Sequence, residues 1–179
     1  MLGIEYLERE HEEITQVINA VESKCIEIMK GKEINQEYFA DVIEFIRVYA
    51  DDTHHKKEED ILFRLMTENL GETAEKLIRS GMLTEHQMAR YYVMELERNL
   101  AEYAENPNDV NKIQIIANAM SYVNLLRVHI EKENEVVYPF GANNLSKEVL
   151  SMFNEEMAEK IELEKGIIIG KEELIRKLI

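Results

Sequence analysis

Glycine and proline are scarce in this chain, which has 7 glycines and 2 prolines among its 179 residues. Together they make up about 5% of the sequence, where average usage gives roughly 12%. Few turn residues mean few turns, which argues against sandwiches, barrels and many-stranded α/β sheets and favours a few long helices. The single cysteine excludes a disulfide framework and cysteine-type zinc sites.

Basic residues and long apolar runs are also in short supply. The 21 lysines and arginines stand against 36 acidic residues, so the net charge is −15 and nucleic acids and anionic membranes would be repelled. No apolar run approaches the ~20 residues of a membrane span, and residues 1–10 lack the apolar core of a signal peptide. We therefore expect a cytoplasmic protein that binds neither nucleic acid nor membrane.

What the sequence does contain is helical periodicity. Apolar residues recur at steps of three and four in four long segments, at about residues 4–30, 35–69, 82–105 and 119–140. Asn35 is expected to cap the second segment, and Gly31 and Pro139 to end the first and the fourth. We predict an all-α fold: an antiparallel up-down four-helix bundle in residues 1–144.

Residues 145–179 are expected to form a C-terminal helical extension. It would consist of two shorter helices separated by residues 166–170, with Ser146 as a cap on the first. Their apolar residues predict that they pack on the bundle or on a partner subunit. The second arrangement would give a homodimer.

Four of the five histidines lie on the apolar stripes, one in each long segment: His11, His55, His86 and His129. Glu59 and Glu133 follow two of them at i+4, which puts imidazole and carboxylate on the same helix face. Unpaired carboxylates are costly in an apolar core. The two carboxylates could pair with protonated histidine or lysine in a polar layer, or they could turn to solvent. Alternatively, a metal cluster could compensate their charge. Four imidazoles and two carboxylates suit iron, manganese or zinc.

A cluster of two ions bridged by the carboxylates would leave positions open for hydroxide, O2, NO or peroxide. Other residues on these stripes are open to two interpretations. Tyr122 would be either a packing aromatic or a hydrogen-bond donor or redox residue near a substrate pocket. Asp52 would be either a surface charge or a group that orients a ligand imidazole.

The segments 54–63 (HHKKEEDILF) and 129–134 (HIEKEN) resemble the second-helix and fourth-helix motifs of the hemerythrin-like, or HHE cation-binding, family. The resemblance covers about residues 5–141. It implies a di-iron centre, oxo- or hydroxo-bridged, with Glu59 and Glu133 bridging; manganese or zinc are alternatives. Its metal ligands would be His11, His55, Glu59, His86, His129 and Glu133.

The pair His54 and Glu58 has the same i,i+4 spacing as His55 and Glu59. The stripe phase favours His55 and Glu59, so His54 is expected at a helix flank or the surface, about 100° away. A ferritin-like site is the nearest rival, but it needs two Glu-x-x-His motifs and the chain has one, from Glu8.

The sequence departs from the pattern of oxygen-carrying hemerythrins. His86 is followed at i+4 by Arg90 where those carriers have a second histidine, and Glu133 stands at i+4 of His129 where they have an aspartate at i+5. The chain is more similar to the branch with iron-centre repair proteins and hemerythrin-like proteins linked to NO or peroxide. Cys25 is the only cysteine in this sequence, so we do not expect an iron-donor role that depends on the cysteine-pair domain of the repair proteins.

Three functions follow as hypotheses. The first is a di-iron protein that binds or turns over O2, NO or peroxide. The second is a metal-binding sensor, storage or regulatory module without turnover. The third is a structural bundle whose C-terminal helices mediate assembly. Whether the protein is an enzyme stays open at this point.

Overall fold

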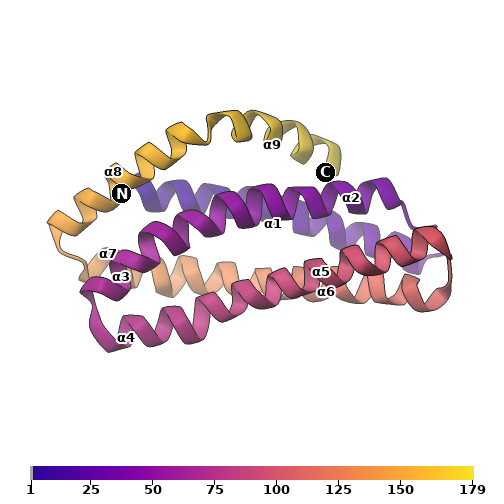
Figure 1. Ribbon diagram of the computed structural model, residues 1–179, viewed down its shortest axis with the longest axis horizontal. Coiled ribbons are helices and arrows are strands. Elements are labelled where there is room, and N and C mark those ends of the chain that lie inside the picture. Colours follow the sequence, from indigo (N-terminus) through magenta and orange to yellow (C-terminus); the bar gives the residue numbers. More distant parts are fainter. Residues whose placement is uncertain (1) are drawn as a thin grey trace.

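The computed structural model describes residues 2–179, with only the backbone described for residues 167–169 (Figure 1). The described residues form helices and no strand, which confirms the predicted all-α class. The first helix, α1 (Leu2–Met29), ends as predicted next to Gly31, whose φ of 97° is accessible to glycine at low cost.

The second long segment is helical throughout but is not a uniform α-helix. It runs through α2 (Gln36–Phe45), η1 (Ile46–His55), η2 (Glu58–Phe63) and α3 (Arg64–Asn69). The stretches η1 and η2 are π-helical, with wider turns that are uncommon in proteins and frequently occur at functional sites. Asn35 caps α2 as predicted, because its side chain accepts a hydrogen bond of 3.0 Å from the backbone N–H of Tyr38.

The third and fourth segments are joined by a short turn. Both begin earlier than the periodicity predicts. The third is built from α4 (Gly71–Lys76), η3 (Leu77–Met82) and α5 (Leu83–Glu105), and the fourth from α6 (Asp109–Lys132), η4 (Glu133–Val137) and α7 (Tyr138–Asn144). The prediction that Pro139 ends the fourth segment is wrong. Pro139 lies in the first turn of α7, where its missing N–H is not required, and the helix continues to Asn144.

Two further helices, α8 (Lys147–Leu163) and α9 (Lys165–Leu178), form what we call the C-terminal arm. Ser146 caps α8 as predicted, but the two helices meet at Glu164 and not at residues 166–170; the side chains of residues 167–169 lie outside the described residues. Both helices lie against α1, and α9 also contacts α2 and η1 (Figure 1). The arm therefore covers one side of the first two segments.

The apolar core is divided into two clusters by a band of buried polar residues. One cluster includes Ile14, Ala50, Ala89 and Leu126, and the other includes Leu7, Leu62, Met82 and Val137. On each long segment, the histidines and glutamates singled out above fall between a residue of one cluster and a residue of the other. The fold thus places its buried polar groups at one level. None of the described helices combines the length and apolarity that a membrane crossing needs.

Candidate metal centre

Seven titratable side chains occupy this level, and we call them the polar layer. Each is at most 2% exposed: His11, His54, His55, Glu58, His86, His129 and Glu133. Burial of so many polar groups is costly unless each has a partner or an ion compensates them.

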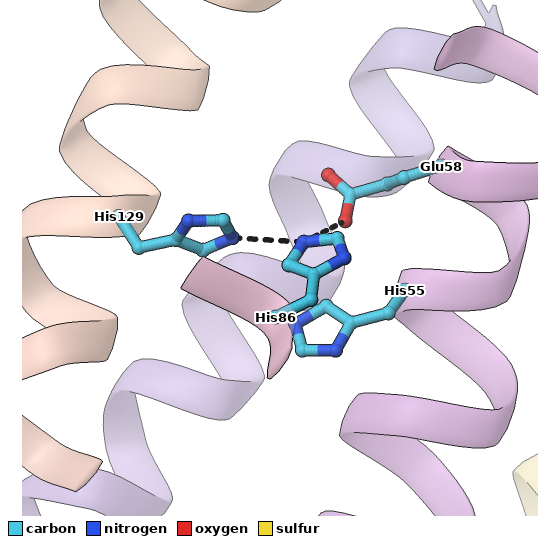
Figure 2. Close-up of side chains that lie close together, drawn as sticks. All are labelled: His55, Glu58, His86 and His129. Carbon is cyan, nitrogen blue, oxygen red and sulfur yellow. Dashed lines mark hydrogen bonds and ion pairs between the residues drawn. The ribbon is translucent and has the colours of Figure 1, made fainter. Parts of the chain in front are cut away.

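The polar layer divides into two groups with metal-ligand geometry. One group comprises His55, Glu58, His86 and His129 (Figure 2), and the other comprises His11, His54, Glu58 and Glu133. In each group, one ligand atom from every member lies within 4.8 Å of those of all the others. Glu58 belongs to both groups, so its carboxylate lies where it could bridge two neighbouring ions.

The structure brings together five of the six residues expected as ligands: His11, His55, His86, His129 and Glu133. Glu59 is not among them. Its carboxylate lies outside the layer, accepting hydrogen bonds from Nδ1 of His86 (2.8 Å) and from Arg90 (2.9 Å). Glu58 takes its place, and the expectation that His54 lies at a flank or the surface is wrong, because His54 is 1% exposed.

The π-helical turns explain both differences. An α-helix advances about 100° per residue, so neighbouring residues diverge in direction. The i→i+5 hydrogen bonds of η1 widen the turn, and the angle between successive side chains falls. His54 and His55 therefore both reach the polar layer, and the carboxylate one turn beyond His54 is that of Glu58. The prediction from sequence used the periodicity of an α-helix and therefore selected Glu59, the neighbour of Glu58.

Every imidazole of the layer is held through its Nδ1 atom by a partner outside the layer. The contacts are His11 to Asn134 (2.7 Å), His54 to Glu10 (2.9 Å), His55 to Asp51 (3.2 Å), His86 to Glu59 (2.8 Å) and His129 to Glu85 (2.8 Å). A carboxylate only accepts, so each Nδ1 facing one carries the hydrogen that it donates. When its Nε2 atom carries no proton, a ring held in this way presents the Nε2 lone pair to the centre, the usual arrangement of metal-bound histidine.

The Nε2 atoms crowd around the two glutamates. Nε2 of His86 lies 3.1 Å from Nε2 of His129, and Oε2 of Glu133 lies 3.1 Å from Nε2 of His129 and 3.2 Å from Nε2 of His11. Among the described residues, Nε2 of His55 and Oε2 of Glu58 are buried without any hydrogen-bond partner. Lone pairs that converge in this way are compensated either by protons or by cations, and the donor set fits a metal pair.

In the metal-free layer, the pKa values of several side chains differ strongly from their ordinary values. Burial would raise the pKa of Glu133, but the imidazoles of His129 and His11 hold it well below its usual range. Burial and the neighbouring Glu133 raise the pKa of Glu58 well above its usual range. Burial lowers the pKa of His129, yet Glu133 and Glu85 outweigh it and bring the value to about 10. Burial lowers the pKa of His54 and His55 far below normal.

The layer repeats itself in the two halves of the chain. His11 and His54 are 43 residues apart, as are His86 and His129, and Glu58 corresponds to Glu133. The partners repeat as well, and they come from matching positions: Glu10 and Glu85 hold His54 and His129, while Asn134 and Glu59 hold His11 and His86. His55 breaks the repeat, since Ile130 stands at the corresponding position. One side of the centre therefore has one imidazole more.

A cavity of about 180 Å³ adjoins this additional histidine. His55, Ala89, Arg90 and Tyr122 are among the residues that line it. Arg90 donates to Asp51 at 2.6 Å and to Glu59 at 2.9 Å, the two carboxylates that hold His55 and His86. The hydroxyl of Tyr122 is buried and has no hydrogen-bond partner in the described part of the chain. Asp51, and not its neighbour Asp52, thus holds a ligand imidazole, because it lies four residues before His55 on the same helix face.

Sequence reasoning missed His54 and Glu58 as members of the layer, although the signal was present. His11 and His54 are 43 residues apart, as are His86 and His129, whereas His11 and His55 are 44 apart. This repeated spacing identifies His54 as the counterpart of His129. The carboxylates that hold the rings come mostly from other helices, 27 to 44 residues away in three cases, and no local pattern reveals them.

A buried layer of converging imidazoles and carboxylates in an all-helical fold defines a helical metal-binding protein. Comparison with protein families matches residues 2–140 to the hemerythrin HHE cation binding domain, and the chain belongs to this family. Comparisons with curated proteins and with solved structures find no match.

Proposed function

We propose that the polar layer holds two iron ions and that the protein binds or reacts with a small ligand, O2, NO or peroxide. His11, His54 and Glu133 would hold one ion, His55, His86 and His129 the other, and Glu58 would bridge them. The observation that carries this proposal is the convergence of five Nε2 atoms on two fully buried carboxylates, with every Nδ1 already held. Manganese or zinc are compatible with the same donors.

Bound iron would supply redox chemistry and positions at which a small molecule can coordinate. The protein supplies the remainder. Asn134, Glu10, Asp51, Glu59 and Glu85 fix the ring orientations and make the rings better donors. The cavity beside His55 gives a small ligand space at the side with the additional imidazole, and Arg90 places a positive charge at its wall.

The proposal extends to the arrangement of the chain. The four long segments would form the up-down antiparallel bundle expected from sequence, with residues 1–144 as its unit and the C-terminal arm as an addition. Support comes from the short turn at 106–108 and from the contacts of α6 with both α5 and α1. A cytoplasmic location is consistent with the single, buried, free Cys25.

The test is metal quantitation together with an optical spectrum of aerobically purified, iron-replete protein. Two metals per chain and near-ultraviolet absorption of a ferric pair are expected, and well under two metals per chain would overturn the proposal. Consumption of peroxide or NO no faster than with free iron, at full metal content, would favour the alternative of a sensor, storage or regulatory module without turnover.

A further inference from the structure

A lysine is buried next to the polar layer, where the C-terminal arm meets α1 and η1. Lys57 is 0% exposed. Its Nζ donates to the backbone oxygen of Thr53 at 2.9 Å and to Oε2 of Glu164 at 2.8 Å, and it lies 3.0 Å from Oε1 of Glu10. Two carboxylates therefore share one buried ammonium group.

One of these carboxylates also holds a proposed metal ligand. Oε2 of Glu10 accepts a hydrogen bond of 2.9 Å from Nδ1 of His54. Three polar contacts in series thus lead from Glu164 through Lys57 and Glu10 to His54. Glu164 joins α8 to α9 and lies beyond residues 2–140, the part of the chain that the family accounts for.

The other half of the molecule supplies an internal comparison. Glu85 corresponds to Glu10, and it likewise holds an imidazole, that of His129, and pairs with a lysine, Lys132. The side chain of Lys132 is 39% exposed, and within the described part of the chain Glu85 is its only ion-pair partner. The C-terminal arm therefore adds a third charge to only one of two repeated arrangements.

We propose that Glu164 is a positioning residue that sets the metal affinity of the side of the centre formed by His11, His54 and Glu133. The carboxylate of Glu164 compensates part of the positive charge of Lys57. Glu10 therefore remains able to accept a hydrogen bond from the Nδ1–H of His54. Without the carboxylate of Glu164, the buried ammonium would depend on Glu10 alone, because a buried charge needs compensation. The hydrogen bond to His54 would weaken, and Nε2 would become a poorer donor.

This inference rests on the proposed metal centre, and it implies coupling in both directions. If docking of the arm strengthens one metal site, metal bound at that site must stabilise the docked arm by the same factor. The two ions would then differ in affinity, although their ligands largely repeat.

The experiment compares Glu164→Gln, Glu164→Asp and a matched control, Glu156→Gln. Glu156 belongs to the same arm and pairs with Arg64 at 2.6 Å, but its pair is half-exposed. Stepwise Fe(II) titration against a chromophoric chelator should show one of two sites weakened about tenfold in Glu164→Gln, the lower end of the effect of ligand-orienting partners. Glu164→Asp should recover part of this loss, and Glu156→Gln should match the wild type.

A second measurement uses the metal-free protein, so it does not depend on metal loading. Nitrogen-15 shifts of the His54 ring should change in Glu164→Gln and stay constant in Glu156→Gln. Unchanged shifts, or equal weakening of both sites, would overturn the positioning role. A wild type that binds no metal while the His54 shifts respond would instead count against the proposed function alone.

Discussion

The Nε2 atoms of His86 and His129 lie 3.1 Å apart and face each other across the polar layer. The Nδ1 atom of each ring is already bound to a carboxylate, that of Glu59 or Glu85, so neither ring can turn to relieve the contact. Two lone pairs at this distance repel unless a proton or a metal ion lies at them. In the metal-free protein one of the rings must therefore carry a second proton.

Metal binding should release this proton. The pKa of His129 is about 10 in the metal-free protein. Burial lowers this pKa, but the carboxylates of Glu133 and Glu85 raise it by more than burial lowers it. At pH 8 the ring is consequently protonated, the ion has to displace the proton, and affinity should rise with pH up to about 10. Calorimetric titration of Zn²⁺ in two buffers with different ionisation enthalpies measures the release, and buffer-independent heats would refute it.

Exchange of neighbouring glutamates should separate the bridging carboxylate from the one that orients a ring. Glu58→Gln removes the carboxylate that both groups share, so we expect the loss of at least one bound metal per chain. Glu59→Gln should keep both metals but weaken binding about tenfold, because Glu59 orients the ring of His86 from outside the layer.

Metal content measured by mass spectrometry of the two purified variants decides between these roles. Each variant exchanges one carboxyl group for an amide of the same size, so the pair controls for the type of substitution. The reverse result, with Glu59→Gln losing the metal and Glu58→Gln retaining it, would restore the ligand set first read from the stripe.

Filling the cavity beside His55 should block small ligands without disturbing the metals. Ala89 lines the cavity, so Ala89→Leu places a larger apolar group there. We expect azide to bind the iron-loaded variant at least about tenfold more slowly in stopped-flow measurements, with metal content unchanged. Ala104→Leu, at a surface hollow distant in sequence from the layer, is the control. Equal azide rates in wild type and Ala89→Leu would mean that ligands enter elsewhere.

The packing of the C-terminal arm on α1 depends on a glycine. A Cβ at Gly3 would lie 2.6 Å from the ring of Phe153, too close for a real contact. Gly3→Ala should therefore lower the free energy of unfolding by about 1–3 kcal/mol, the usual cost of overpacking. In Gly81→Ala the new methyl group meets nothing within 4 Å, so this variant should be neutral or slightly stabilised. Urea unfolding of both variants tests the difference, and equal midpoints would argue against tight docking.

The sequence predicted those members of the polar layer that lie on regular helices. His11, His86 and His129 are on α1, α5 and α6, where the 3.6-residue period holds and one stripe faces the core. In the second segment the stripe points to Glu59, whereas Glu58 lies in the polar layer, because no local sequence pattern predicts a π-helical turn.

Other features depend on the tertiary fold. Glu10 reaches His54 and Glu164 reaches Lys57 only after distant segments pack together, 44 and 107 residues apart in sequence. The sequence indicated that the last helices would pack on the bundle or on a second subunit; the structure lays them on α1 and α2 of the same chain. Assembly into a homodimer stays a prediction.

Gly3 and Lys57 both lie in the part of the chain that the family accounts for, and both make contacts with the C-terminal arm. Phe153 fills the notch at Gly3, and Glu164 completes the charges around Lys57, yet both lie beyond the residues common to the family. A polypeptide ending at residue 140 would leave the notch open to water and the ammonium group short of one carboxylate. The part of the chain that the family accounts for is therefore shorter than the part that packs together in this structure.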